Sequence, residues 1–179
     1  FIKQNKIMAN CVLTNGIPIE CMDNTGGIKN VYIGAFSDAT TFTYDADEII
    51  DTVTSTETFY TFKFRPQTSS LTEEATASVE NGTNFFTQNI AMSFHKMSAT
   101  NRNTMLLLIQ ASTHVIVEDQ NGVYWWCGLA NGANVTAQTN AAGQAYGDLN
   151  GNTVTLTGLE PLPMHQLSSV AFGLLTKAA

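Results

Sequence analysis

The chain has little charge, few basic residues and no long hydrophobic run. Charged residues make up 13% of its 179 residues, about half the share that is usual in a soluble domain. Only 8 residues are Lys or Arg, against 15 Asp or Glu, and the net charge is −7. A nucleic-acid-binding site needs clustered Lys and Arg, so the excess of acidic over basic residues argues against such a site. The same excess is compatible with an acidic wall that repels DNA. No run of about 18 apolar residues exists, and we therefore expect no membrane span.

Cysteine is scarce as well. Cys11, Cys21 and Cys127 form an odd set, and the sequence leaves open a disulfide between Cys11 and Cys21. Free thiols are favoured, because the N-terminus lacks the apolar segment of a secretory signal and the protein is then expected to be made in the cytosol.

The motifs of catalysis and cofactor binding are also missing. There is no Gly-x-Ser-x-Gly, no Cys-x-x-Cys, and Gly26-Gly27 is not part of a phosphate-binding loop. The segment Asp148–Asn152 begins like a calcium loop, but Thr153 and Leu159 stand where such a loop needs Gly and Glu. We therefore predict that the chain is not an enzyme and has no catalytic residue, metal or cofactor.

What the sequence does contain is a series of β-strand patterns rich in β-branched and aromatic residues. The expected strands are Val31–Phe36, Thr41–Tyr44, Ile49–Thr54, Thr58–Arg65, Leu71–Glu80, Phe85–Met97, His114–Glu118, Val123–Leu129, Val135–Gln138 and Asn152–Leu159. Asn81-Gly82 and Asn121-Gly122 are strong turn signals between consecutive strands. The two strands around Pro66–Ser70 are expected to form a long hairpin, Thr58–Glu80, that projects from the core.

One helix is predicted, Ala99–Ala111, with Ser98 as its N-cap and an apolar stripe of Met105, Leu108 and Ile109. The fold class is therefore mainly β, a β-sandwich or barrel with one helix and extended terminal arms. We divide the chain into an N-terminal arm (1–30), a β-sandwich domain (31–160) and a C-terminal tail (161–179). The tail is apolar and nearly uncharged, so we expect it to be buried against a neighbouring subunit.

Asp45, Asp47, Glu48 and Asp51 form an acidic cluster between two expected strands. It is either a solvated face or a wall that repels phosphate inside an assembled channel.

Several segments, in this order, are similar to virion proteins of phages and prophages of Bacteroidetes-type bacteria: Gly26–Ile33, Glu80–Phe86, Ile116–Asp119, and Gly147–Asn152 leading into Thr155–Glu160. With its acidic, mainly β composition and its expected long hairpin, the chain resembles bacteriophage tail tube proteins over Met8 to Pro161.

The resemblance implies a subunit that forms hexameric rings, in which inner strands of neighbouring copies continue one sheet around a lumen. The projecting hairpin and the terminal arms would contact the next ring, DNA would pass through without specific binding, and other tail proteins of the virion would be partners. On this basis we place three residues in an acidic lumen, Asp45, Asp47 and Glu48. The predicted assembly-interface residues are Thr58, Phe62, Arg65, Pro66, Leu71 and Glu73.

Two alternatives stay open. One is a protein that decorates or cements a capsid. The other is a carbohydrate-binding receptor module, in which Tyr124, Trp125 and Trp126 would supply the aromatic face that stacks on a sugar ring.

Overall fold

The structure, a computed structural model, describes residues 16–19 and 21–178. Most of the predicted N-terminal arm therefore lies outside the described residues. Within them the fold is mainly β, as predicted, and a second short helix accompanies the expected one. The elements are β1 (Ile28–Ala35), β2 (Thr41–Tyr44), β3 (Ile50–Thr54), β4 (Thr58–Lys63), β5 (Ser70–Ser78), β6 (Thr83–His95), α1 (Ala99–Gln110), β7 (Thr113–Asp119), β8 (Tyr124–Cys127), β9 (Ala133–Ala141), β10 (Gly151–Glu160), β11 (His165–Leu167), α2 (Ser169–Leu174) and β12 (Thr176–Ala178).

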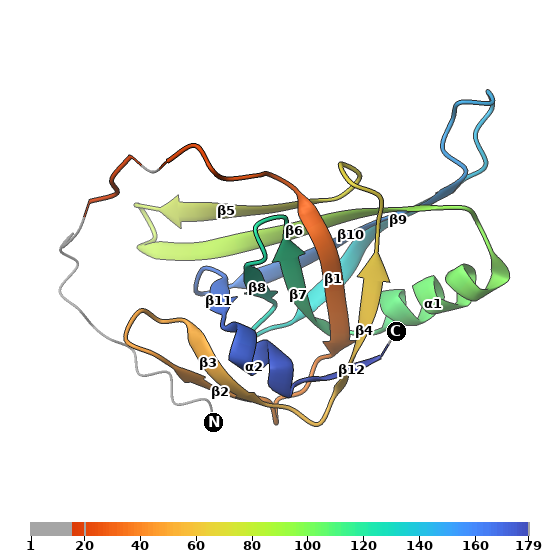
Figure 1. Ribbon diagram of the computed structural model, residues 1–179. Coiled ribbons are helices and arrows are strands. Elements are labelled where there is room, and N and C mark those ends of the chain that lie inside the picture. Colours follow the sequence, from red (N-terminus) through yellow and green to blue (C-terminus); the bar gives the residue numbers. More distant parts are fainter. Residues whose placement is uncertain (1–15, 20, 179) are drawn as a thin grey trace.

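All strands join one sheet in the order β2-β3-β11-β8-β7-β9-β10-β6-β5, with β1, β4 and β12 branching from β7. The sheet folds over on itself (Figure 1), so that the long strands β5, β6, β9 and β10 lie behind β1, β4 and β7. Within the described residues, no helix is both long and apolar enough to cross a membrane.

The core is divided by β1 and β7, whose side chains point alternately to two sides. On one side, in what we call the first core, Val31, Val115 and Val117 pack with α1 and with the long strands β6 and β10. On the other side, in the second core, Tyr32 and Ile116 pack with residues of β3, β4, β8, β11 and α2. This burial on both faces explains why Val115, Ile116 and Val117 follow one another in β7 instead of alternating with polar residues.

The predicted helix is confirmed as α1, and the Ser98 side chain accepts a hydrogen bond of 3.1 Å from the backbone N–H of Asn101. Its buried residues are Met105 and Leu108. The predicted burial of the rest of the apolar stripe is wrong, because Ile109 is 47% and Leu107 is 68% exposed.

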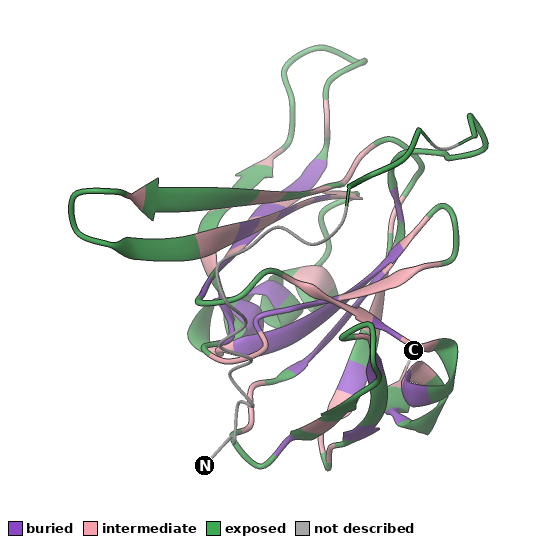
Figure 2. Cartoon of the chain, turned by 90° about the vertical axis from the view of Figure 1, so that its left-hand side faces the viewer, coloured by how far each residue is buried: buried purple, intermediate pink, exposed green. Residues whose placement is uncertain are grey.

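The hairpin predicted around Pro66–Ser70 is wrong. β4 pairs with β1 and β12, whereas β5 pairs with β6 around the Asn81-Gly82 turn. The reason is the burial of aromatic residues on β4. Phe59 is fully buried against Trp126, and Phe62 packs against Phe94, so β4 remains in the core, whereas β5 beyond Glu73 is largely exposed. The hairpin that projects is β5–β6, and Figure 2 shows its outer part as exposed.

The expectation of an extended C-terminal tail is also wrong. β11 pairs with β3 and β8, and β12 pairs with β4. Leu167, Ala171 and Leu175 are buried in the second core. Part of the apolar surface of this segment is therefore buried within the chain itself, whereas Val170 and Leu174 are 67% and 61% exposed.

Candidate assembly surface

The four long strands form a layer in the order β9-β10-β6-β5. Within it, β10 pairs with β6 from Gly151↔His95 to Glu160↔Phe86, and β5 pairs with β6 from Ser70↔Ala91 to Ser78↔Thr83. These registers place alternate residues of each strand in rows across the layer, because side chains alternate between faces. One face of the layer covers the first core and the other faces away from it.

The outer face is composed mainly of small neutral polar residues, with Phe85 and Leu159 as its large apolar side chains. Three neighbouring strands are linked across it: the hydroxyl of Thr136 lies 3.0 Å from that of Thr157, which donates a hydrogen bond of 2.8 Å to Oδ1 of Asn89. Glu74 is the one charged side chain among the paired residues of this face. Its members, all exposed or half-exposed, are Thr72, Glu74, Thr76, Phe85, Thr87, Asn89, Ala91, Ser93, Asn134, Thr136, Ala137, Thr139, Thr153, Thr155, Thr157 and Leu159.

Buried polar groups fix the inner face of the layer to the rest of the fold. The Gln88 side chain is 1% exposed; its Oε1 accepts from the backbone N–H of Gly128 at 3.0 Å, and its Nε2 donates to Glu73 at 3.0 Å. The Glu160 carboxylate accepts from the backbone N–H groups of Ala130 and Asn131. Burial raises the pKa of Glu160 even though these N–H groups favour the charged form. The layer is therefore held in one position by specific hydrogen bonds as well as by apolar contacts.

Both long edges of the layer lack a strand partner over most of their length. β5 pairs with β6 only. β9 pairs with β10 along its length and meets β7 at the single pair Thr113↔Ala133. Among residues 16–19 and 21–178, no strand covers the outer edge of β5, over 9 residues, or that of β9 beyond Ala133.

The structure separates the predicted interface residues. Thr58 pairs with Thr176 of β12, and Phe62 and Leu71 pack against the first core. Glu73 accepts hydrogen bonds from Gln88 and from the backbone N–H of Met164, the latter at 2.7 Å. These residues thus have partners inside the chain, whereas the other two, Arg65 and Pro66, are exposed in the β4–β5 connection.

Asp45, Asp47 and Glu48 lie in the turn between β2 and β3, at the opposite end of the strand order from β5. All three are exposed, and Oδ1 of Asp45 accepts from the backbone N–H groups of Asp47 and Ile49, each at 2.9 Å. These residues are not on the outer face of the long-strand layer. Their assignment to a lumen remains a prediction.

Among the described residues, which do not include Cys11, the histidines and cysteines do not form a reactive group. His114 is buried, and its Nδ1 lies 2.8 Å from the carbonyl oxygen of Gly128. Burial lowers the pKa of His114 from its ordinary value of 6.5. Cys127 is buried and Cys21 exposed, and both are free thiols. No group of three or more potential metal ligands occurs among the residues that the structure describes.

The sequence reasoning missed the free edge of β9 and the outer face itself. A signal for the face was present, because Thr and Asn recur at alternate positions along β10 and β9. The sequence carries no such signal for the edges, because a strand lies at an edge only when no other strand pairs with one of its sides. Comparison of the chain with protein-family models, curated proteins and solved structures found no match in any of the three.

Proposed function

We propose that this chain is a structural subunit that assembles with copies of itself into rings, which stack into a hollow tube of the kind found in phage tails. The observation that carries the proposal is the pair of free edges on one layer of long strands. A long unpaired edge is a template for another strand, and monomeric proteins usually block it. Here no strand of the part of the chain that the structure describes covers either edge over most of its length.

The strand directions are compatible with closure of a ring. All neighbouring pairs of the layer are antiparallel, so β5 runs opposite to β9. When a second copy with the same orientation is placed beside the first, its β9 is antiparallel to β5 of the first copy. Such a contact joins two different surfaces, and repetition of it closes a ring if the rotation between copies allows.

The outer face fits the wall of a channel that DNA passes through. It offers neutral hydroxyl and amide groups, one carboxylate at Glu74 and no Lys or Arg. Binding to DNA is dominated by cationic contacts with phosphate, and a wall without cations does not hold the passing duplex.

The outer part of the β5–β6 hairpin supports stacking of the rings. A hairpin of only two strands is marginally stable in water without further packing. Val79, next to the turn, is 99% exposed and Phe85 is 41% exposed. A neighbouring ring would cover these apolar groups, and the same hairpin would then connect successive rings.

The proposal is tested by electron microscopy and sedimentation of the purified chain and of two matched variants. Ala75→Lys with Ala77→Lys places two charges on exposed positions of the β5 edge, on the side of the strand away from the proposed wall. The control, Ala142→Lys with Ala145→Lys, changes the net charge equally in the exposed β9–β10 turn. We expect rings or tubes from the wild type and the control, and monomers from the edge variant. Tubes from the edge variant would contradict the proposed pairing.

A further inference from the structure

The two adjacent tryptophans of β8 have different environments. Trp126 is fully buried, with the rings of Phe42 and Phe59 around it at centroid distances of 5.0 and 5.6 Å. Trp125 is half-buried and belongs to neither core cluster. It also has no aromatic partner among the described residues. The core therefore encloses the indole of Trp126 and leaves that of Trp125 partly exposed.

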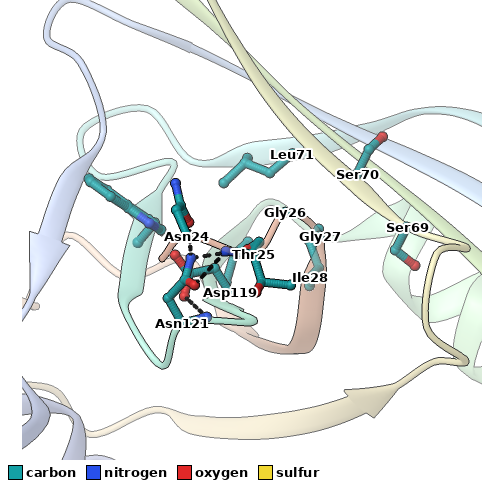
Figure 3. A pocket seen from close by; sticks show the side chains of 12 residues that line it. Asn24, Thr25, Gly26, Gly27, Ile28, Ser69, Ser70, Leu71, Asp119 and Asn121 are labelled. Carbon is teal, nitrogen blue, oxygen red and sulfur yellow. Dashed lines mark hydrogen bonds between the residues drawn. The ribbon is translucent and has the colours of Figure 1, made fainter. Parts of the chain in front are cut away.

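Trp125 lines a hollow of about 320 Å³. The hollow lies between the loop before β1, the start of β5 and the β7–β8 turn (Figure 3). Its apolar lining comes from Trp125, Ile28, Leu71 and Val117. The indole and these aliphatic groups give the hollow one apolar side.

Polar side chains gather at the β7–β8 turn, and they are held in place. Oδ1 of Asp119 accepts from the backbone N–H groups of Asn121 and Val123, at 2.8 and 2.9 Å. Asn121 in turn accepts from the backbone N–H of Thr25 at 2.9 Å and donates to the side chain of Asn24. Figure 3 shows Asn24, Asp119 and Asn121 together at one end of the hollow.

This network leaves hydrogen-bonding capacity for a ligand. A carboxylate has two oxygens and an amide has two N–H groups. Asp119 uses Oδ1 for the turn, and the Asn24 side chain uses its oxygen to accept from Asn121. Oδ2 of Asp119 and the amide N–H groups of Asn24 thus make no hydrogen bond among the described residues and are held by fixed neighbours.

The charge of the lining narrows the class of ligand. Of the described residues, Asp119 is the one charged residue that lines the hollow, and no Lys or Arg of this part of the chain does so. Phosphates and carboxylates are therefore disfavoured. A neutral ligand that fits has one apolar face for the indole and hydroxyl groups for the carboxylate and amide. A pyranose ring has this chemistry.

We propose that the hollow beside Trp125 is a binding site for a neutral saccharide. In it, the C–H face of the sugar stacks on the indole of Trp125, and sugar hydroxyls donate to Oδ2 of Asp119 and accept from the amide of Asn24. This inference goes beyond self-assembly and does not depend on it, because every group involved belongs to one copy of the chain.

The test is saturation-transfer NMR of the full chain with glucose, galactose, mannose, rhamnose and N-acetylglucosamine, followed by a glycan array for longer saccharides. Quenching of tryptophan fluorescence by acrylamide supplies a second readout, because Trp126 is fully buried and Trp125 is the accessible indole. We expect at least one saccharide to show transfer and to protect Trp125 from the quencher.

Three variants assign the binding to this hollow. Trp125→Ala should abolish it, and Asn24→Ala should weaken it about tenfold, which corresponds to one hydrogen bond of about 1.4 kcal/mol. The control is Tyr146→Ala, which removes a fully exposed aromatic ring from the β9–β10 turn and should change nothing. Circular dichroism establishes that each variant is folded. The inference is overturned if no saccharide binds, or if binding persists in folded Trp125→Ala.

Discussion

The hydroxyl of Tyr32 donates a hydrogen bond of 2.9 Å to Oε2 of Glu118, and so joins β1 to β7 inside the fold. The same carboxylate accepts from Nδ2 of Asn30 at 2.7 Å and from Nζ of Lys29 at 2.7 Å. Burial by itself would raise the pKa of Glu118, but the hydrogen bonds from Asn30, Lys29 and Tyr32 together outweigh it, and the pKa lies below its ordinary value of 4.5.

This network predicts a loss of stability in acid. Because the pKa of Glu118 is lower in the folded chain than in the unfolded one, the charged carboxylate stabilises the fold at pH values above 4.5, the ordinary pKa of this group. That contribution is lost as the pH falls through the folded pKa. Glu118→Gln should remove this part of the pH dependence, which urea unfolding across the acidic range measures. An unchanged acid limb in the variant would show that other carboxylates cause it.

Removal of the Tyr32 hydroxyl isolates one bond of the network. Tyr32→Phe preserves the ring, which packs edge-on against Phe172 at a centroid distance of 4.8 Å. We expect a loss of about 1 to 3 kcal/mol in the free energy of unfolding, since one donor to a buried carboxylate is lost. Urea unfolding measures it, and a variant as stable as the wild type would mean that water replaces the hydroxyl.

His114 predicts a second pH dependence, in a higher range. Burial lowers its pKa from the ordinary value of 6.5, so the unfolded chain takes up a proton more readily than the folded one. Stability should therefore fall as the pH drops below about 6.5. His114→Gln should be less stable at neutral pH but should show a flatter curve in this interval. Thermal unfolding at a series of pH values measures both effects.

Gly34 of β1 is required by a close approach. A Cβ atom at this position would lie 3.0 to 3.2 Å from ring carbons of Phe59, which is fully buried and cannot move away easily. Gly34→Ala should therefore cost about 1 to 3 kcal/mol. The matched control is Gly26→Ala, because nothing lies within 4 Å of a Cβ there. Equal stability of the two variants would contradict the rigid packing of Phe59.

The channel wall can be located by charge. If the outer face of the long-strand layer lines the lumen, Glu74→Lys should give tubes that retain double-stranded DNA at low salt and release it at high salt. Asp47→Lys with Glu48→Lys tests the other predicted wall, in the β2–β3 turn. Co-sedimentation of DNA with the tubes distinguishes the two. Retention by the second variant alone would assign the lumen to Asp45, Asp47 and Glu48.

Much of the local structure could be predicted from the sequence, because it rests on local chemistry. Ser98 marks the start of α1, and Gly82 and Gly122, with φ of 63° and 78°, mark the turns after β5 and β7. Pairing over long distances could not be predicted. β4 and β5 alternate in the same way and are separated by a plausible turn, yet β4 pairs with β12, where Thr58 meets Thr176. No local pattern encodes such a partner.

The same contrast between local patterns and long-range pairing applies to the candidate surfaces. The shortage of Lys and Arg argued against a nucleic-acid-binding site, and the resemblance to tail tube proteins indicated an assembling protein, but no neutral polar face was predicted. The position of that face depended on the registers of β5, β6, β9 and β10. The environment of Trp125 depended on the fold as well, since adjacent residues on a strand point to opposite faces and only the structure shows which of them the core covers.

The most direct test of self-assembly through the free edges is a cryo-electron microscopy reconstruction of the polymer formed by the purified chain. We expect a tube in which β5 of each copy is hydrogen-bonded to β9 of the next copy, with Glu74 and the neutral face around it toward the lumen. A polymer in which β5 has no strand neighbour, or a chain that stays monomeric at every concentration, would contradict the account.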